Sequence, residues 1–314
     1  MMYKIKKKLR KANHESIIIN KLYTKASYLK SNFSRFISDE LFAKIKYKES
    51  TGRNLNLTHP VLFNEKLWWL MINNRNSLMT KCTDKVSVRD YIKSIGLGHI
   101  LTDIQGVYTS PEDIPFDEMI GKFFIKCNHG SGVNSIFDSS KPQSFNRNLF
   151  IKDFNFSLKR NYYYYNREWN YKNIKPKIIV EKFIESEGDF FDYKILCFHG
   201  KAKLIFVDKN IALDNGRHDP ESRRNIYDRN FNFQNFTIGR SNFDRKLVKK
   251  PDNLDKMIEI AEKISQPFIF CRVDLYNNNG VIKFGEITFY TGGATQQFSD
   301  IESDLMVSSW LKVP

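Results

Sequence analysis

The sequence predicts an α+β fold, and three observations favour this class. The first part of the chain reads as helical and basic, the middle mixes helices with strands, and the end is rich in strands. The strands do not alternate regularly with helices, as they would in a doubly wound sheet. The chain has 314 residues, of which 41% are hydrophobic, so it is long enough for about two or three domains with substantial cores.

Helices are predicted where apolar residues recur at helical spacing behind a residue suited to an N-cap. Residues 1–60 read as helical up to the breaker Thr58-His59-Pro60. Three further helices are expected: 63–71 with Asn64 as its cap, 84–96 capped by Asp84 and ended by Gly96, and the segment that follows Asp252.

Strands are predicted from short apolar runs bounded by turn residues. They cover residues 123–127, 133–137, 177–184, 193–198, 202–207, 268–276 and 281–289. His199-Gly200 is expected to close a hairpin between two of these strands. The last two strands flank the turn Asn277–Gly280.

The net charge of +15 raises the question of a nucleic-acid-binding protein. Residues 1–53 contain 14 basic and 4 acidic residues, which gives +10 of that total. The basic residues therefore do not spread along an aromatic-bearing sheet, and no known nucleic-acid-binding motif is present. We expect no nucleic acid partner, although a basic nucleic-acid-binding protein stays an alternative from another functional class.

Other compositional features favour a cytoplasmic protein. No apolar run approaches the ~18 residues of a membrane span. The basic start lacks the apolar core and cleavage site of a signal peptide, so export is not expected. The four cysteines form no CxxC pair, which makes a zinc knuckle unlikely and a reducing compartment the natural interpretation.

The segment Lys126-Cys127-Asn128-His129-Gly130-Ser131-Gly132 is the first candidate for chemistry. Glycines allow the backbone to approach a phosphate closely, and the lysine before them could neutralise its charge. The segment is neither a P-loop nor a dinucleotide fingerprint, because no helix opens after it. What remains is a glycine-rich hairpin, for which a plain β-turn is the alternative.

The last two strands carry charged residues on one face. Alternation places Arg272 and Asp274 on the face opposite to Val273, and Glu286 and Thr288 share a face of the next strand. Carboxylates from adjacent strands suit Mg²⁺, with substrate phosphates completing the coordination. The alternative is a cross-strand salt bridge between Arg272 and Glu286.

The pairing of these strands decides whether the carboxylates meet. A tight turn that pairs Tyr276 with Val281 sets Asp274 opposite Lys283, three residues from Glu286 or about 10 Å. A shared metal therefore requires a longer connection or a β-bulge.

A third candidate is the strand Lys177–Ile184 together with the acidic residues that follow it, Glu185, Glu187 and Asp189. An apolar strand that ends in backbone groups and acids could pair an adenine edge and ribose hydroxyls. An ordinary strand that leads into a solvated acidic loop is the alternative.

Taken in order, these segments resemble the ATP-grasp superfamily, and most closely the TupA-like ATP-grasp family, which is associated with bacterial cell-surface polysaccharide synthesis. The resemblance runs from about Phe63 to about Gly293. It is carried by Phe63-Asn64-Glu65-Lys66, Thr83-Asp84-Lys85 with Arg89, Lys126–Gly132, Arg167-Glu168-Trp169, Glu181-Lys182-Phe183, Asp192-Tyr193-Lys194, Arg272–Tyr276 and Phe284–Phe289.

The resemblance implies a role for each of these positions. ATP would be bound by Lys85, Lys126, the lid Gly130-Ser131-Gly132, Glu181, the Phe183 backbone, and Glu187 or Asp189 at the ribose. Mg²⁺ would be held by Asp274, Glu286 and Thr288, where many ATP-grasp enzymes have an asparagine in place of the threonine. Arg272 and Lys194 would be catalytic, with Arg272 stabilising the oxyanion of a tetrahedral intermediate.

The implied activity is an ATP-dependent carboxylate–amine ligase that works through an acyl phosphate. The expected acceptor is a surface glycan or its precursor, for example a uronic acid joined to an amine or amino acid. A sugar kinase is the alternative outcome. The predicted divisions are a basic helical region at 1–82, a lid subdomain at 83–180 and a C-terminal subdomain with the metal strands at 181–314.

Two further expectations concern partners. The aromatic cluster Tyr162–Tyr165, Trp169 and Tyr171 could dock sugar rings or simply fill a core. The six basic residues within positions 1–12 precede the region of resemblance. At about 1 kcal/mol per basic residue, they could attach the enzyme peripherally to the anionic inner face of the cell membrane.

Overall fold

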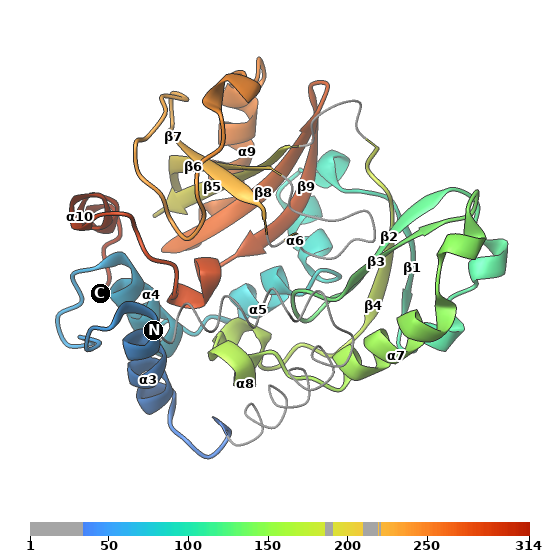
Figure 1. Ribbon diagram of the computed structural model, residues 1–314, viewed down its shortest axis with the longest axis horizontal. Coiled ribbons are helices and arrows are strands. Elements are labelled where there is room, and N and C mark those ends of the chain that lie inside the picture. The colour runs from blue at the N-terminus through green and yellow to red at the C-terminus, as the bar shows by residue number, and fades with distance from the viewer. Residues whose placement is uncertain (1–33, 186–190, 210–218, 220) are drawn as a thin grey trace.

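Two antiparallel sheets form the framework of the computed structural model, which describes residues 34–185, 191–209, 219 and 221–314 (Figure 1). The first sheet has the order β1-β4-β2-β3. Its strands are β1 (Ile104–Tyr108), β2 (Lys122–Cys127), β3 (Asn134–Asp138) and β4 (Ile178–Lys182). The predicted hairpin around the glycine-rich segment is present, because β2 and β3 pair from Lys122↔Asp138 to Lys126↔Asn134.

The second sheet has the order β7-β6-β5-β8-β9. Its strands are β5 (Phe191–Phe198), β6 (Lys201–Lys209), β7 (Arg223–Asp228), β8 (Phe270–Asn278) and β9 (Val281–Thr288). His199 and Gly200 join β5 to β6, both with positive φ, as expected for a tight hairpin turn. β1 and β7 were not predicted, because polar residues interrupt their apolar pattern and make both segments resemble loops.

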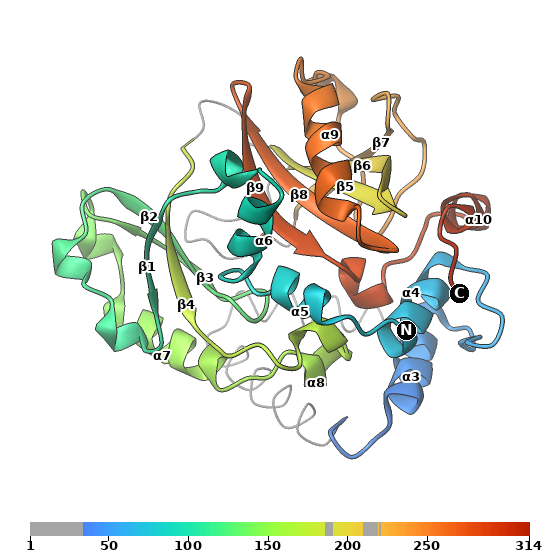
Figure 2. The same cartoon turned by 180° about the vertical axis from the view of Figure 1, so that it is seen from behind.

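Helices pack around and between the sheets. They are α3 (Asp39–Thr51), α4 (Phe63–Asn73), α5 (Ser77–Thr83), α6 (Val88–Ser94), α7 (Arg147–Leu158), α8 (Tyr163–Asn166), α9 (Leu254–Ser265) and α10 (Ile301–Ser309). In both cartoon views α5 and α6 lie between the sheets (Figures 1 and 2). The mixture of helices with antiparallel sheets confirms the predicted α+β class.

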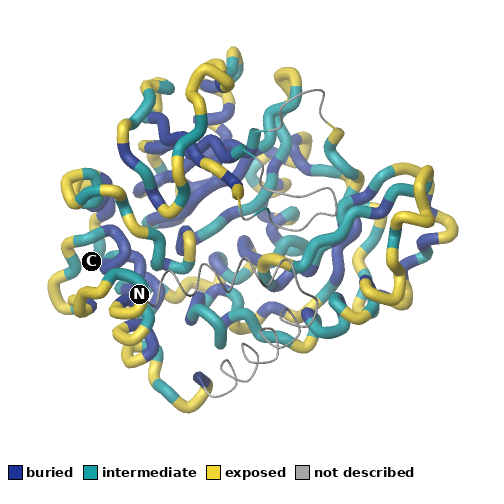
Figure 3. Tube along the Cα trace, viewed as in Figure 1, coloured by how far each residue is buried: buried dark blue, intermediate teal, exposed yellow. Residues whose placement is uncertain are grey.

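Each sheet buries one face against a helix. Phe150 and Phe154 of α7 pack with Phe123 and Ile125 of the first sheet. On the second sheet, α9 packs against β5, β6 and β8. The same core continues into α3 and α4, where the ring of Phe63 meets that of Phe270 edge-on at 5.4 Å. The tube coloured by burial shows this buried sheet and the exposed outer turns (Figure 3). The other face of each sheet is left for polar side chains.

Three predicted N-caps are wrong. Asn64 is the second residue of α4, and its Nδ2 donates to the carbonyl of Gln296 at 2.6 Å, while Glu65 accepts the free N–H groups at the helix start. Asp84 follows the unpredicted helix α5 as its C-cap and then accepts from the N–H of Val86. α9 begins after Asn253, one residue later than expected.

Two expectations about placement stay open. No helix in the described ranges is both long and apolar enough to cross a lipid bilayer. The basic segment 1–12 lies outside the described residues. The divisions at residues 82 and 180 stay predictions.

Candidate active site

The polar face of the second sheet brings the two predicted metal carboxylates together. β8 and β9 join through the two-residue turn Asn279-Gly280, so that Tyr276 pairs with Lys283. The register then shifts between Asp274 and Leu275, which sets Asp274 opposite Glu286. The predicted offset of three residues is thus removed in two ways: the pairing of Tyr276 with Lys283 in place of Val281 accounts for two residues, and this β-bulge accounts for the third. It falls at Gly285, where a Cβ would approach the carbonyl oxygen of Asp274 to 3.1 Å.

Arg272 organises this face. Its Nε and Nη2 each donate to one oxygen of Asp274 at 2.7 Å, and Nη2 also donates to Thr288 Oγ1 at 3.0 Å. Glu286 lies 3.4 Å from the same Nη2. Burial alone would lower the pKa of Arg272, but Asp274 and the other carboxylates outweigh it and raise the pKa. The salt bridge that the sequence left as an alternative is therefore present, together with the paired carboxylates.

Lys194 adds a second fixed cation from the neighbouring strand β5. Its Nζ donates to Asp274 Oδ2 at 2.8 Å and also to Asp192 Oδ2. All three side chains are almost completely buried. Burial raises the pKa of Asp192 to about 6 against the opposing charge of Lys194. Asp192 was not predicted as a site residue, although alternation within β5 places its side chain on the same face as that of Lys194.

Lys85 connects this face to the glycine-rich turn. Its Nζ donates to the carbonyl of Gly130 at 2.9 Å and lies 3.7 Å from Glu286 Oε2. Burial works to raise the pKa of Glu286, yet Lys85, Arg272 and more distant lysines lower it to about 2. Glu286 is therefore a stable anion between the two sheets.

Asn128 and His129, at the start of the glycine-rich turn, anchor it by hydrogen bonds. The Asn128 side chain donates to Asp84 Oδ1 and to the Lys175 carbonyl, and it accepts from the N–H of Lys177. His129 is buried with its Nε2 against the Ser157 carbonyl, and burial lowers its pKa. Ser131 and Gly132 follow these anchored residues and are exposed, and Gly132 has a φ of +97°. Asn128 was missed as an anchor because a single asparagine carries no signal in one sequence.

The polar face of the first sheet holds a second ion pair. Lys126 Nζ lies 2.7 Å from Glu181 Oε2, and Arg89 Nη1 lies 3.8 Å from the other oxygen of the same carboxylate. Lys126 also acts electrostatically on Glu286, so the two sheets contribute charges to one region.

The residues after β4 form the outer part of the predicted nucleotide site. The N–H of Phe183 donates to the Lys122 carbonyl at 2.9 Å, and Lys122 Nζ lies over the Phe183 ring at 4.0 Å. The Phe183 N–H is thus used within the sheet, so a contact between the Phe183 backbone and a base would have to use its carbonyl. Glu187 and Asp189 lie outside the described residues.

The donor set on β8 and β9 fits Mg²⁺. Asp274 Oδ1 receives one hydrogen bond and keeps a lone pair, and Glu286 retains 40% of its side-chain exposure. In the described ranges no three His, Cys, Asp or Glu side chains cluster to hold a metal by themselves. Mg²⁺ in nucleotide sites takes one or two protein carboxylates and completes its shell with phosphates and water. Thr288 Oγ1 already bonds Arg272 and Glu286, so its predicted ligation stays a prediction.

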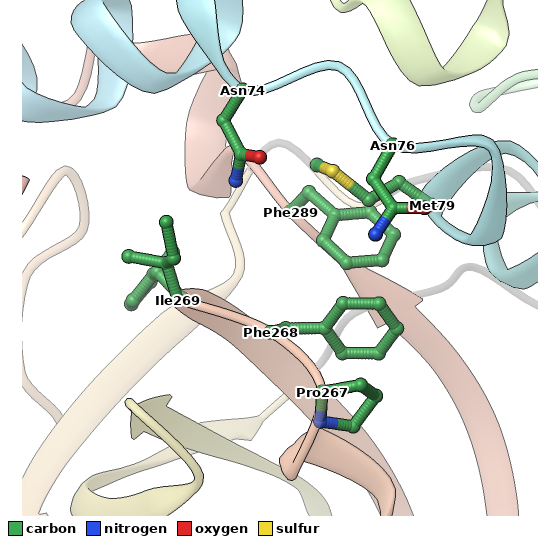
Figure 4. Close-up of a pocket in the computed structure, with 8 residues that line it drawn as sticks. Asn74, Asn76, Met79, Pro267, Phe268, Ile269 and Phe289 are labelled. Atoms are coloured by element: carbon green, nitrogen blue, oxygen red, sulfur yellow. The ribbon is translucent and has the colours of Figure 1, made fainter. Parts of the chain in front are cut away.

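A small recess elsewhere has no charged lining. Figure 4 shows it between the end of α4 and the start of β8, with Asn74, Asn76 and Met79 on one side and Pro267 and Phe268 on the other. None of the predicted site residues lines it. We assign the candidate site to the facing polar surfaces of the sheets instead.

Comparison with known proteins is consistent with this arrangement. The model of the TupA-like ATPgrasp family matches residues 65–312. A search of curated proteins finds no significant match.

Among solved structures, the chain is similar to D-alanine–D-alanine ligase from Bacillus anthracis complexed with ATP, with 14% identity, a TM-score of 0.40, and 67% and 56% of the two chains covered. It is also similar to L-amino acid ligase from Bacillus licheniformis, with 14% identity, a TM-score of 0.43, and coverage of 74% and 49%. The chain spans about half the length of these relatives. With identities and TM-scores this low, these similarities carry no argument about the role of the chain.

Proposed function

This chain belongs to the TupA-like ATP-grasp family, and from that premise we propose that it is an ATP-dependent carboxylate–amine ligase. The reaction would transfer the γ-phosphoryl group to a carboxylate and let an amine displace phosphate from the acyl phosphate. A carboxylate is a poor electrophile, so this activation makes attack by the amine feasible. Catalysis of such transfers consists mainly of positioning and charge neutralisation.

One observation carries the proposal: Lys85 touches both the glycine-rich turn and the carboxylate face of the second sheet. A polyphosphate lying between these surfaces would meet Lys85 and, from the first sheet, Lys126. Gly132 leaves room for close backbone approach, because nothing in the described part of the chain lies within 4 Å of the position of a Cβ there, whereas Tyr162 occupies the corresponding space at Gly130. Glu181 and the Phe183 carbonyl lie at the end of the first sheet where the base would bind.

Asp274 and Glu286 would hold Mg²⁺, which supplies charge neutralisation at the phosphates when bound. Arg272 is anchored by Asp274, Thr288 and Thr291, so its guanidinium stays in place without reorganisation. A fixed cation of this kind stabilises charge that develops on an oxyanion. Lys194 holds Asp274 from the opposite side.

The acceptor that we propose is a uronic acid unit of a bacterial surface polysaccharide or its precursor. Its support is the association of the family with polysaccharide synthesis and the tyrosine-rich segment next to the glycine turn. The decisive screen incubates the enzyme with Mg-ATP, uronic acids and a panel of amino acids, and follows ADP release and product mass. ADP release that requires both substrates, with an amide product, supports the ligase. Release without an amine, with a phosphorylated sugar, would make the protein a kinase.

Lys126→Ala should weaken ATP binding by about 10-fold or more, because a charge-assisted contact to phosphate is worth about 1.5–3 kcal/mol. The measurement is calorimetric titration with a non-hydrolysable ATP analogue. Lys182→Ala serves as the matched control, since Lys182 lies on the adjacent strand with 65% of its side chain exposed. Unchanged affinity in Lys126→Ala would remove Lys126 from the nucleotide site.

Deletion of residues 1–12 tests the proposed peripheral attachment to anionic membranes. Removing the six basic residues in this segment should abolish most co-sedimentation with vesicles that contain anionic lipid, because each contributes about 1 kcal/mol near such a surface. The catalytic rate in solution should not change. Equal pelleting of the shortened and full chains would contradict this role.

A further inference from the structure

Glu168 is a buried carboxyl group for which the mechanism above has no use. It is the second residue after α8, behind Arg167, and is only 5% exposed. Its Oε1 accepts a hydrogen bond from Asn166 Nδ2 at 3.3 Å. Among the described residues it forms no ion pair. A buried carboxylate without a cation is costly, and such groups often mark a binding site.

Glu168 lies against the segment that follows β9, because a Cβ at Gly293 would be 3.7 Å from its Oε1, and the charges of Glu286 and Arg272 on the second sheet both act on it. Burial raises the pKa of Glu168 to about 7; Glu286 adds to this effect, and Asn166 and Arg272 oppose it. A cation bound next to Glu168 would therefore offset the free-energy cost of burying its negative charge. Its position also suits a reactant, because Glu286 is one of the two carboxylates at the centre of the proposed phosphate site.

Two tyrosines lie close to Glu168 in the chain, and the N–H of Tyr171 donates to the Glu168 carbonyl at 3.1 Å. The rings of Tyr162 and Tyr171 meet with their centroids 4.7 Å apart. Burial raises the pKa of both hydroxyls, and the charges of Glu168 and Glu286 add to this effect. The hydroxyl of Tyr290 is buried nearby and has no hydrogen-bond partner among the described residues.

Tyr162 also touches the glycine-rich turn. A Cβ at Gly130 would lie 3.1 Å from Tyr162 Cδ2. On the other side, a Cβ at Gly293 would lie 3.7 Å from Glu168 Oε1. Tyr162 therefore lies against the glycine-rich turn, and Glu168 lies against the segment that follows β9.

A carboxylate beside aromatic faces is a typical receptor for an ammonium group, through one ion pair and cation–π attraction. We propose that Glu168, Tyr162 and Tyr171 bind the amino group of the amine co-substrate. The inference rests on the proposed ligase function and names the subsite for its nucleophile. A carboxylate acceptor would be repelled by Glu168 and Glu286 and attracted to Arg272, so the two substrates would sort to different sides.

In this position Glu168 can also accept a proton from the ammonium group of the bound amine. The bound ammonium loses one proton to the Glu168 carboxylate and becomes a neutral amine. The nitrogen lone pair then forms the N–C bond to the acyl carbon, the C–O bond to phosphate breaks, and its electron pair leaves with the phosphate. The second proton of the nitrogen goes to the departing phosphate, and Glu168 returns its proton to solvent.

Amine binding can be measured without turnover. The enzyme, loaded with Mg²⁺ and a non-hydrolysable ATP analogue, is titrated with the twenty amino acids and with glucosamine, and each binder is compared with its N-acetyl form. We expect at least one amine to bind wild type, its N-acetyl form not to bind, and Glu168→Gln to weaken the amine about 10-fold or more. The analogue itself should bind the variant within about twofold of wild type.

Two further substitutions separate the carboxylate from the ring. Tyr171→Leu should weaken the amine several-fold, whereas Tyr171→Phe, which keeps the aromatic face, should not. Glu259→Gln on the exposed side of α9 is the control for loss of a carboxylate. A thermal melt confirms that each variant is folded.

The proposal is overturned if no amine binds wild type, or if Glu168→Gln binds the same amine equally well. A failure of the proposed function would look different, because no carboxylate would then support ADP release even if amine binding depended on Glu168.

Discussion

An enzyme that carries Asp274→Asn should release ADP at least about 1,000-fold more slowly than wild type at saturating Mg-ATP, a loss of about 4 kcal/mol in transition-state stabilisation. Asn keeps the volume of the side chain but removes the charge that would face Mg²⁺ and that fixes Arg272 and Lys194. The substitution should therefore weaken the charge neutralisation at the phosphates and, at the same time, the positioning of Arg272 for stabilising the oxyanion. Steady-state ADP release, coupled to a spectrophotometric readout, measures the effect.

Glu286→Gln should give a similar loss, since the two carboxylates face each other across the bulge. Asp255→Asn on the exposed start of α9 should keep the wild-type rate. Circular dichroism and a thermal melt establish that the inactive variants are folded. Turnover near the wild-type rate in Asp274→Asn would remove the metal assignment.

Lys194→Met should lower the free energy of unfolding by about 3–5 kcal/mol, because it leaves one side of a buried ion pair uncompensated. Asp274 would keep Arg272, but Asp192 would lose the cation that its Oδ2 accepts from, and its Oδ1 already has no partner among the described residues. Urea denaturation at pH 8 measures the change.

The pH dependence of this deficit has a defined sign. The pKa of Asp192 is already raised to about 6 in the folded protein, so protonation removes the unpaired charge as the pH falls through that value. The deficit should be full at pH 8 and smaller below pH 6. The double variant Lys194→Met with Asp192→Asn should recover most of the lost stability at pH 8. Lys201→Met, at a side chain with 72% exposure, should change stability by less than about 0.5 kcal/mol. A loss below about 1 kcal/mol in Lys194→Met would show that the buried pair is not stabilising.

Much of the fold follows from local pattern. Period-two alternation predicted that Arg272 and Asp274 share a polar face, and the bidentate contact between them places them there. His199-Gly200 predicted the hairpin between β5 and β6. Such features depend on neighbours in the chain, which one sequence contains in full.

Several features were not predicted, some because the local pattern is weak and others because they depend on tertiary contact. α7 was missed because its Asn, Lys and Asp residues obscure the stripe formed by Phe150 and Phe154. The bulge at Gly285 could be stated only as a requirement, since the choice between turns of different length is made by the packing of the whole sheet. Glu168 was not predicted as a site residue. Tyr162 and Tyr171 lie close to it in the chain, but its burial and its closeness to Gly293 depend on a distant segment, which a single sequence does not bring together.

The formation of an acyl phosphate is the central claim, and one isotope measurement tests it most directly. The acceptor selected by the ADP-release screen is labelled with ¹⁸O in its carboxylate and incubated with the enzyme, Mg-ATP and the amine. The ligase account predicts that the released inorganic phosphate carries one ¹⁸O atom, taken from the carboxylate when the C–O bond breaks. Phosphate without ¹⁸O, or a stable phosphorylated sugar in place of an amide, would contradict it.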